Sequence, residues 1–349
     1  MTAVEVNTSL RYNVYIGKGL ISRCGELILK AVPACKAAII SDDKVFPIYG
    51  EQVKKSLEKS GFDVVEYIFK NGEESKNLQT YCDTVEFLAN EKLKRSDIVI
   101  ALGGGVVGDL AGFCAATYLR GIRFIQIPTT ILAACDSSVG GKTAVDLSCG
   151  KNLAGAFHQP SAVICDTDTF KTLDKRQISC GYAEIIKYGM IRDKNLFYAL
   201  QNGSYSEQEI ITRCVEIKRD IVESDEKENG ERKLLNFGHT LGHAIEKHSR
   251  FSLTHGEAVA LGMIMITEIS EKLGLCSGIL NQLSLLLKKF SLPVSYEISK
   301  DEMISLAASD KKNETDGITL VLPSEEIGRC VLKKVSMAEF EKMLSVILH

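Results

Sequence analysis

DIVIALGGGVVGDLAGFCAA, residues 97–116, predicts a buried strand, a glycine turn and the start of a helix. Gly103, Gly105 and Gly108 satisfy the spacing G-x-G-x-x-G, in which glycine permits the tight turn and a close approach of the backbone to a pyrophosphate. A glycine turn without any ligand would show the same letters. The stretch therefore predicts one strand–turn–helix unit of an α/β domain, and it raises the question of a dinucleotide.

The rest of the first half alternates short β-branched runs with amphipathic helical stretches. The helical stretches include residues 50–61 and 77–93. Such alternation predicts crossover helices and a largely parallel sheet, with ligands at the carboxyl ends of its strands. The predicted strands are residues 36–45, 63–69, 97–105, 123–130 and 161–167.

From about Thr172 onward the apolar residues recur at helical spacing, and a strand-like run appears only near residues 318–323. The sequence therefore predicts an α/β domain over residues 1–171 and a mainly helical domain over 172–349. We expect the active site in a cleft between them.

Composition excludes several classes of protein. The 349 residues are 45% apolar and 25% charged with a net charge of −3, which argues against bulk binding of nucleic acid. No apolar run is long enough to span a membrane, and no signal peptide is recognisable, so we expect a cytoplasmic protein. The eleven cysteines are scattered without a C-x-x-C pair, which indicates reduced thiols.

The ordinary dinucleotide fingerprint has an acid about 20 residues after the glycines, at the end of the next strand. Here that position falls in IQIPTT, residues 125–130. A carboxylate for a ribose must then come from elsewhere, and Asp42 and Glu73 are the candidates.

A polar block follows the fourth strand, at residues 128–160. Glycines loosen the backbone around Lys142 and Lys151, so that amide N–H and ammonium groups could converge on a phosphate. A P-loop is excluded because it needs glycine where Asp136 stands. The polar residues of the block are Thr129, Thr130, Asp136, Ser137, Ser138, Lys142, Lys151 and Asn152.

Four of the six histidines lie in residues 234–259. His239 and His243 stand one helical turn apart, and either could bind a metal by spacing alone. The absence of a glutamate after His239 disfavours a zincin protease. His255 at a predicted helix start is a further ligand candidate, and Glu184, one turn from Lys187, is the candidate carboxylate. The other histidines are expected in a loop or facing solvent: His158, His248 and His349.

Several stretches together resemble the 3-dehydroquinate synthase family, in order and across nearly the whole chain. The wider sugar phosphate cyclases share some of them. The stretches are GEESK at 72–76, GGGVVGDLAGFCAATYLRGI at 103–122, IQIPTT at 125–130, residues 136–160, GYAEIIKYG at 181–189, LLNFGHTLGHAIE at 234–246, HGEAVALGM at 255–263 and DKKN at 310–313.

The resemblance implies the fold of that family: an α/β N-terminal domain with a Rossmann-like, mostly parallel sheet and a mainly α-helical C-terminal domain. It also implies that Glu184, His239 and His255 bind zinc, with cobalt as an acceptable substitute. His243 is then implied to face the substrate's phosphate rather than the metal.

The resemblance assigns the remaining site residues to NAD+ and to the substrate. Those implied for NAD+ are Asp42, Glu73, Lys76, Gly104, Gly105, Val106, Asp109, Thr129, Thr130, Lys142, Lys151, Thr169 and Thr172. Those implied for the substrate are Asp136, Lys142, Asn152, Lys187, Lys218, Arg232, Asn236, His243 and a lysine of DKKN, for which we favour Lys311 over Lys312. Arg120 resembles an arginine that the family lends across the interface of a homodimer.

The implied reaction converts 3-deoxy-D-arabino-heptulosonate 7-phosphate into 3-dehydroquinate and phosphate. Transient oxidation by NAD+ is followed by β-elimination of phosphate, re-reduction, ring opening and an intramolecular aldol. Lys142, Asn152, His243 and Arg120 would hold the phosphate. Lys218 and Arg232 would clamp the carboxylate, although either residue alone would usually be a solvated surface charge.

Three other readings stay open. A cyclase of the 2-deoxy-scyllo-inosose synthase type would use the same metal and NAD+, but Lys218, Arg232 and Asn236 suit a substrate that carries a carboxylate. A metal-dependent polyol dehydrogenase of the glycerol dehydrogenase type would have a similar glycine turn and helical domain. A non-catalytic NAD-binding regulator would not need the set Glu184, His239 and His255.

Overall fold

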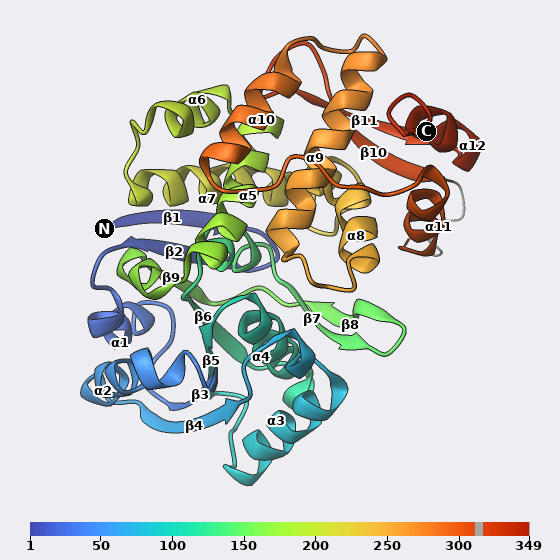
Figure 1. Ribbon diagram of the computed structural model, residues 1–349. Helices are drawn as coiled ribbons and strands as arrows, with labels where there is room; N and C mark the ends of the chain where they lie inside the picture. Colours follow the sequence, from blue (N-terminus) through green and yellow to red (C-terminus); the bar gives the residue numbers. More distant parts are fainter. Residues whose placement is uncertain (311–316, 349) are drawn as a thin grey trace. The chain divides into compact units, whose positions relative to one another are not determined.

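The structure, a computed structural model, describes residues 1–310 and 317–348 (Figure 1). The chain divides into two compact units. The first comprises Met1–Leu173 with Glu207–Lys227, and the second comprises Asp174–Ser206 with Glu228–His349.

The first unit is built on a seven-stranded sheet in the order β1-β2-β9-β6-β5-β3-β4. All neighbouring strands are parallel except β1 and β2, which form an antiparallel hairpin at one edge. The five predicted strands are present, and the edge hairpin is an addition. The strands are β1 (Thr2–Asn7), β2 (Arg11–Gly17), β3 (Lys36–Asp42), β4 (Asp63–Phe69), β5 (Ile98–Gly103), β6 (Arg123–Pro128) and β9 (Ala162–Asp166).

Helices cover both faces of this sheet (Figure 1). Ile39 and Ile100 pack into the core shared with α1 (Cys24–Ile28) and α2 (Glu51–Lys59). The adjacent Ile40 and Val99 pack into the core shared with α3 (Leu78–Asn90) and α4 (Gly105–Thr117). Burial on both faces explains why these strands are apolar without alternation.

The strand order reverses between β3 and β5, because β4 lies beyond β3 while β6 and β9 lie beyond β5. In open α/β sheets such a reversal leaves a crevice at the carboxyl ends of the two strands, where ligands bind. Asp42 ends β3 and Gly103 ends β5, so both lie at this place.

Two parts of the first unit differ from a simple sequence reading. The polar block forms an antiparallel hairpin of β7 (Lys142–Leu147) and β8 (Gly150–Phe157). Helix α7 (Glu207–Ser224) packs on β1 and β2 and therefore belongs with the sheet, whereas the sequence placed it in the helical domain.

The second unit is mainly helical, as predicted. Helix α9 (His255–Lys272) is buried along most of its length and packs against α5 (Lys175–Ile191), α8 (His239–His248) and α10 (Ile279–Lys289). The unit also contains α6 (Lys194–Asn202), α11 (Lys300–Asp310), α12 (Met337–Leu344) and the hairpin of β10 (Ile318–Pro323) and β11 (Cys330–Val335).

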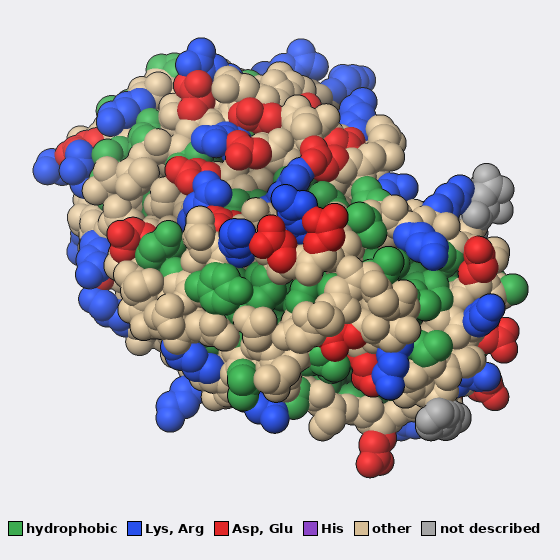
Figure 2. All heavy atoms as spheres, turned by 90° about the horizontal axis from the view of Figure 1, so that it is seen from above, with side chains coloured by type: hydrophobic (Ala, Val, Ile, Leu, Met, Phe, Trp, Pro, Cys, Tyr) green, Lys and Arg blue, Asp and Glu red, His purple; other side chains and the backbone are tan. Residues whose placement is uncertain are grey.

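The surface seen in Figure 2 mixes side chains of both charge signs, with apolar groups between them. No helix of the described residues is long and apolar enough to cross a membrane.

Candidate metal centre and cofactor site

Helix α5 places a carboxylate and an ammonium group inside the second unit. It begins with a capping box between Asp174 and Gln177, which fixes its first turn. Glu184 and Lys187 lie further along its buried face, each only 1% exposed, and their side chains form an ion pair. Buried charges require such partners, and a buried pair of ionisable groups is a candidate for a functional site.

The beginning of α8 is pressed against α9 by glycines. Gly238 precedes His239 with φ +78°, and a Cβ there would lie 2.9 Å from the carbonyl oxygen of Val259. On α9, a Cβ at Gly262 would overlap the carbonyl oxygen of Gly238. Only glycine fits both places, and the close approach holds His239 next to α9.

His255 is the first residue of α9. The helix starts with a capping box in which the hydroxyl of Thr254 accepts from the backbone N–H of Glu257 and the Glu257 carboxylate accepts from that of Thr254. The predicted helix start is therefore present, and the cap fixes the direction in which His255 leaves the backbone.

Three side chains converge on one point. Oε1 of Glu184 lies 3.5 Å from Nε2 of His239 and 3.3 Å from Nε2 of His255. All three potential ligand atoms lie within 4.8 Å of one another. Ligand atoms around a tetrahedral zinc ion are about 3.4 Å apart, given metal–ligand bonds of about 2.1 Å. A small contraction would let these residues share one ion.

The other nitrogen of each imidazole is already engaged. Nδ1 of His239 lies 3.1 Å from the carbonyl oxygen of Phe237, and Nδ1 of His255 lies 3.5 Å from Oε2 of Glu246. Such outer contacts fix the tautomer and leave Nε2 free to bind a metal. Glu246 was not singled out from sequence, although it is a buried acid seven residues after His239, on the same helix face.

The two imidazoles titrate in opposite directions. Burial lowers the pKa of His239 to about 3, because the attraction of Glu184 does not offset the loss of solvent. Burial alone would also lower the pKa of His255, but its interactions with Glu184 and Glu246 outweigh this and raise it to about 9. Without a metal, one proton therefore resides on His255 and supplies positive charge at the centre.

His243 lies beside this group. Its ring centroid is 5.5 Å from that of His239 and 6.0 Å from that of His255. It is not among the three residues whose ligand atoms meet. That His239 binds the metal and His243 faces the phosphate stays a prediction.

Two further residues of the helical unit come from the short helix η7 (Glu231–Asn236). Arg232 is almost fully buried, and Asn236 donates through Nδ2 to Oε1 of Glu228 at 2.9 Å. The burial of Arg232 departs from the solvated arginine that its local sequence suggests. The predicted Lys311 lies outside the described residues.

In the first unit the glycine turn joins β5 to α4 as the sequence indicates. A Cβ at Gly104 would lie 3.1 Å from Cγ2 of Thr130, and the backbone N–H of Thr129 donates to the carbonyl of Gly103 at 3.0 Å. Gly105 and Val106 begin α4. The first N–H groups of a helix lack partners within it, which suits them to a pyrophosphate.

A lysine-centred cluster lies beside this turn. Nζ of Lys76 is 2.9 Å from Oε1 of Glu73, 3.5 Å from Oδ2 of Asp109 and 3.7 Å from Oδ1 of Asp146. Nζ of Lys151 is 3.9 Å from Glu73. Glu73, Lys76, Asp109 and Lys151 were predicted to bind NAD+. Asp146 was missed because the hairpin that contains it was not predicted, so nothing in the sequence related it to Lys76.

The remaining residues predicted for NAD+ are largely engaged in the fold. Oδ1 of Asp42 accepts from the backbone N–H groups of Lys44 and Val45. The hydroxyl of Thr169 donates to the carbonyl of Asp166, and that of Thr172 lies 2.7 Å from the hydroxyl of Tyr49.

Lys218 of α7 pairs with Asp136. Its Nζ donates to the carbonyl oxygen of Asp136 at 2.7 Å and also contacts the carboxylate. Lys142 and Asn152 are exposed on the β7–β8 hairpin, and Asn152 has φ +57°. The structure thus brings Lys218 and Asp136 together, and both were predicted for the substrate.

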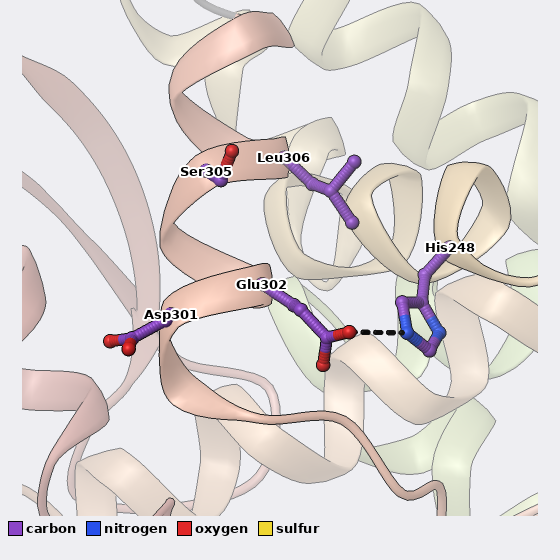
Figure 3. Close-up of a pocket in the computed structure, with 5 residues that line it drawn as sticks. All are labelled: His248, Asp301, Glu302, Ser305 and Leu306. Atoms are coloured by element: carbon purple, nitrogen blue, oxygen red, sulfur yellow. Dashed lines mark ion pairs between the residues drawn. The ribbon is translucent and has the colours of Figure 1, made fainter.

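A cavity of about 470 Å³ opens at the far end of α8 from His239 (Figure 3). Glu302 points toward His248 there, with Oε1 3.6 Å from Nε2, and the hydroxyl of Tyr296 lies 2.7 Å from Nδ1. His248 is therefore half-buried and bonded, rather than solvent-facing as predicted. The cavity is lined by His248, Asp301, Glu302, Ser305 and Leu306. None of these is a predicted site residue.

Comparison with known proteins identifies relatives over nearly the whole chain. Residues 66–180 match a family model described as 3-dehydroquinate synthase N-terminal, and residues 181–313 match one described as 3-dehydroquinate synthase C-terminal. The 3-dehydroquinate synthase of Clostridium acetobutylicum is 46% identical over 345 residues, which cover 96% of this chain and 97% of the relative.

Solved structures of related cyclases have the same fold. A 2-deoxy-scyllo-inosose synthase complexed with carbaglucose-6-phosphate, NAD+ and Co2+ gives a TM-score of 0.86 at 26% identity, over 98% of this chain and 99% of that one. A 2-epi-5-epi-valiolone synthase from Streptomyces hygroscopicus with NAD+ and Zn2+ gives 0.86 at 27% identity, over 98% of both chains.

Proposed function

Because this chain belongs to the 3-dehydroquinate synthase family, the carbon–oxygen lyases of that name in the shikimate pathway, we propose that Glu184, His239 and His255 hold its divalent metal ion. The observation that carries this proposal is the convergence of three ligand atoms within 4.8 Å, with both histidines anchored through Nδ1. Zinc or cobalt fits this set of two nitrogens and one oxygen.

We propose that NAD+ binds at the carboxyl ends of β3 and β5. The glycine turn supports this, since its backbone can approach a pyrophosphate and α4 offers its first N–H groups. Glu73, Lys76, Asp109 and Lys151 lie beside the turn and would contact the ribose and nicotinamide portions.

The substrate proposed for the site is 3-deoxy-D-arabino-heptulosonate 7-phosphate. When bound, NAD+ supplies a hydride acceptor that is regenerated in each turnover, and the metal supplies a Lewis acid for the hydroxyl being oxidised. The residues of the chain bind and orient this flexible acid, and a fixed geometry contributes several kcal/mol to such reactions.

Each end of the substrate would be held by a different set of cations. Lys218 and Arg232 are buried, so a carboxylate paired with them interacts more strongly than it would in water. His243 lies beside the metal ligands and would hold the phosphate together with Lys142 and Asn152. Lys187 is paired with Glu184 and would lie beside the hydroxyl that is oxidised.

We further propose a homodimer in which Arg120 reaches the phosphate of the partner's site. Arg120 is exposed with φ +67°, directly after Leu119 with φ +51°, and such a strained turn suits a residue with a function. Mixing Arg120→Ala with an inactive Glu184→Gln chain should restore part of the activity if the sites are shared. The cytoplasmic location and the cleft between domains stay predictions.

The test of the proposed function measures release of inorganic phosphate from the heptulosonate phosphate, with and without a chelator. We expect release that requires the metal, with no net change in NADH absorbance. Net NADH from a simple polyol would instead indicate a dehydrogenase. Release from a hexose phosphate would indicate a cyclase of the inosose synthase type.

A further inference from the structure

Helices α5 and α9 are joined by contacts in which none of the metal ligands takes part. Arg176 on α5 donates through Nε to Oε1 of Glu257 at 2.8 Å and through Nη2 to Oε2 at 2.6 Å. Nη2 also donates to the carbonyl of Ser252 at 2.7 Å. Glu257 lies in the first turn of α9, so this fork fixes that turn to α5.

A second contact lies one turn further along α5. The backbone N–H of Gly256 donates to Sγ of Cys180 at 3.2 Å. A Cβ at Gly256 would lie 2.6 Å from Cα of Cys180, so the two backbones touch at this point. The residue before Gly256 is the candidate ligand His255.

The spacing on α5 relates both contacts to the metal centre. Arg176, Cys180 and Glu184 follow each other at intervals of four residues and therefore lie along one face of the helix. The first two hold the start of α9, and the third is the ligand that His255 approaches to 3.3 Å.

We propose that Arg176 and Cys180 are positioning residues for the metal centre, which hold the first turn of α9 so that His255 reaches the ion shared with Glu184. This inference rests on the proposed metal-binding role of the three ligands. Metal–ligand distances tolerate only about 0.2 Å, so a slight shift of this turn is felt at the ion. The arginine itself is half exposed, with 53% of its side chain accessible, so its ion pair adds little to global stability.

An effect on the metal centre can be separated from an effect on global stability with Co2+ as a spectroscopic probe in the full chain. We expect Arg176→Ala to weaken Co2+ binding about tenfold and to change the visible d–d absorption, as loss of an outer contact does at other metal sites. Cys180→Ala should have a smaller effect in the same direction, and Cys180→Ser should restore binding because its hydroxyl can accept from Gly256. Arg11→Ala is the matched control, since it removes an exposed Arg–Glu pair from the other unit.

Affinity is measured by chelator competition well below the melting temperature, so that a purely structural loss would leave it unchanged. Wild-type affinity and spectrum in Arg176→Ala would overturn the inference, as would equal weakening by Arg11→Ala. A thiolate-to-cobalt charge-transfer band that disappears in Cys180→Ala would make Cys180 a ligand and overturn its positioning role. Failure of the unaltered chain to bind Co2+ would overturn the proposed metal site itself.

Discussion

Two regions of the chain bury charged groups, and they balance the charge in different ways. In the α/β unit, Lys76 is surrounded by the carboxylates of Glu73, Asp109 and Asp146. Burial raises the pKa of Asp109 to about 6, although the nearby Lys76 opposes that rise. This cluster contains its own cation.

In the helical unit no lysine among the described residues lies at the centre of the cluster. Atoms that could each donate an electron pair to a metal ion converge there instead. Nε2 of His239, Nε2 of His255 and Oε1 of Glu184 meet, while Lys187 occupies only the other side of the carboxylate. The difference teaches that buried ionisable groups can serve different ligands. The Lys76 cluster, proposed to contact NAD+, contains a lysine among its carboxylates, whereas the three ligand atoms around Glu184 are proposed to share a metal ion.

The largest effect is expected when the carboxylate of the proposed metal centre is removed. We expect Glu184→Gln to lower phosphate release by about a thousandfold or more, because a ligand and the Lewis acid it holds are lost together. Bound metal is measured by elemental analysis in the same samples. Glu341→Gln, on the exposed side of α12, is the control and should behave like the unaltered chain. Full activity in Glu184→Gln would refute the metal centre.

The second test removes the cation from the other region. Lys76→Met should destabilise the protein by about 3 kcal/mol, since three carboxylates lose the lysine that lies between them. The loss should be smaller at low pH, where Asp109 is protonated, and should grow as the pH rises through about 6. Denaturant unfolding at two pH values measures this. An equal loss of unfolding free energy at both pH values would contradict the proposed charge balance.

The third test uses pH. Because the pKa of His255 without metal is about 9, metal binding at neutral pH must displace about one proton. The apparent affinity should therefore rise about tenfold per pH unit, or about a hundredfold between pH 7 and pH 9, and level off above that. Calorimetry in buffers of different ionisation enthalpy counts the released protons. A metal affinity that does not change between pH 7 and pH 9 would show that His255 is neutral before the metal binds.

The smallest expected effect is at the outer contact of the metal centre. Glu246→Gln should weaken metal binding about tenfold and lower the pH at which affinity levels off, because an amide stabilises the imidazolium form of His255 less than a carboxylate does. Chelator competition across pH gives both values. An unchanged pH profile would mean that Glu246 does not act through His255.

The α/β sheet was predictable because its signals are local. Residues 97–105 contain β5 and its turn, and this fully buried parallel strand has a continuous apolar run. Residues 63–69 form β4, a largely part-buried edge strand, which its β-branched and aromatic residues indicate. Helix α7 was recognised as a helix, but amphipathic spacing gives only its apolar face and not the partner of that face. The β7–β8 hairpin was missed because glycine and polar residues mask its alternation.

The spacing of residues in the sequence predicted less of the candidate site than of the fold. His239 and His243 share a helix face, so their spacing could not say which one meets Glu184. The deciding contacts come from α5 and α9, which are distant from each other in sequence and are brought close at Gly256. Gly262 lets α9 approach the start of α8. The resemblance to a family supplied the choice, and the structure supplies Glu246, which neither spacing nor resemblance had identified.

The three candidate ligands reside on three separate helices, and this has a consequence for the lifetime of the protein. An ion bound there acts as a staple that the unfolded chain lacks, so its binding free energy is added to the stability of the native fold. Copies that fail to load unfold more often and are exposed to proteolysis. A cell starved of the metal would then lose the polypeptide as well as the activity.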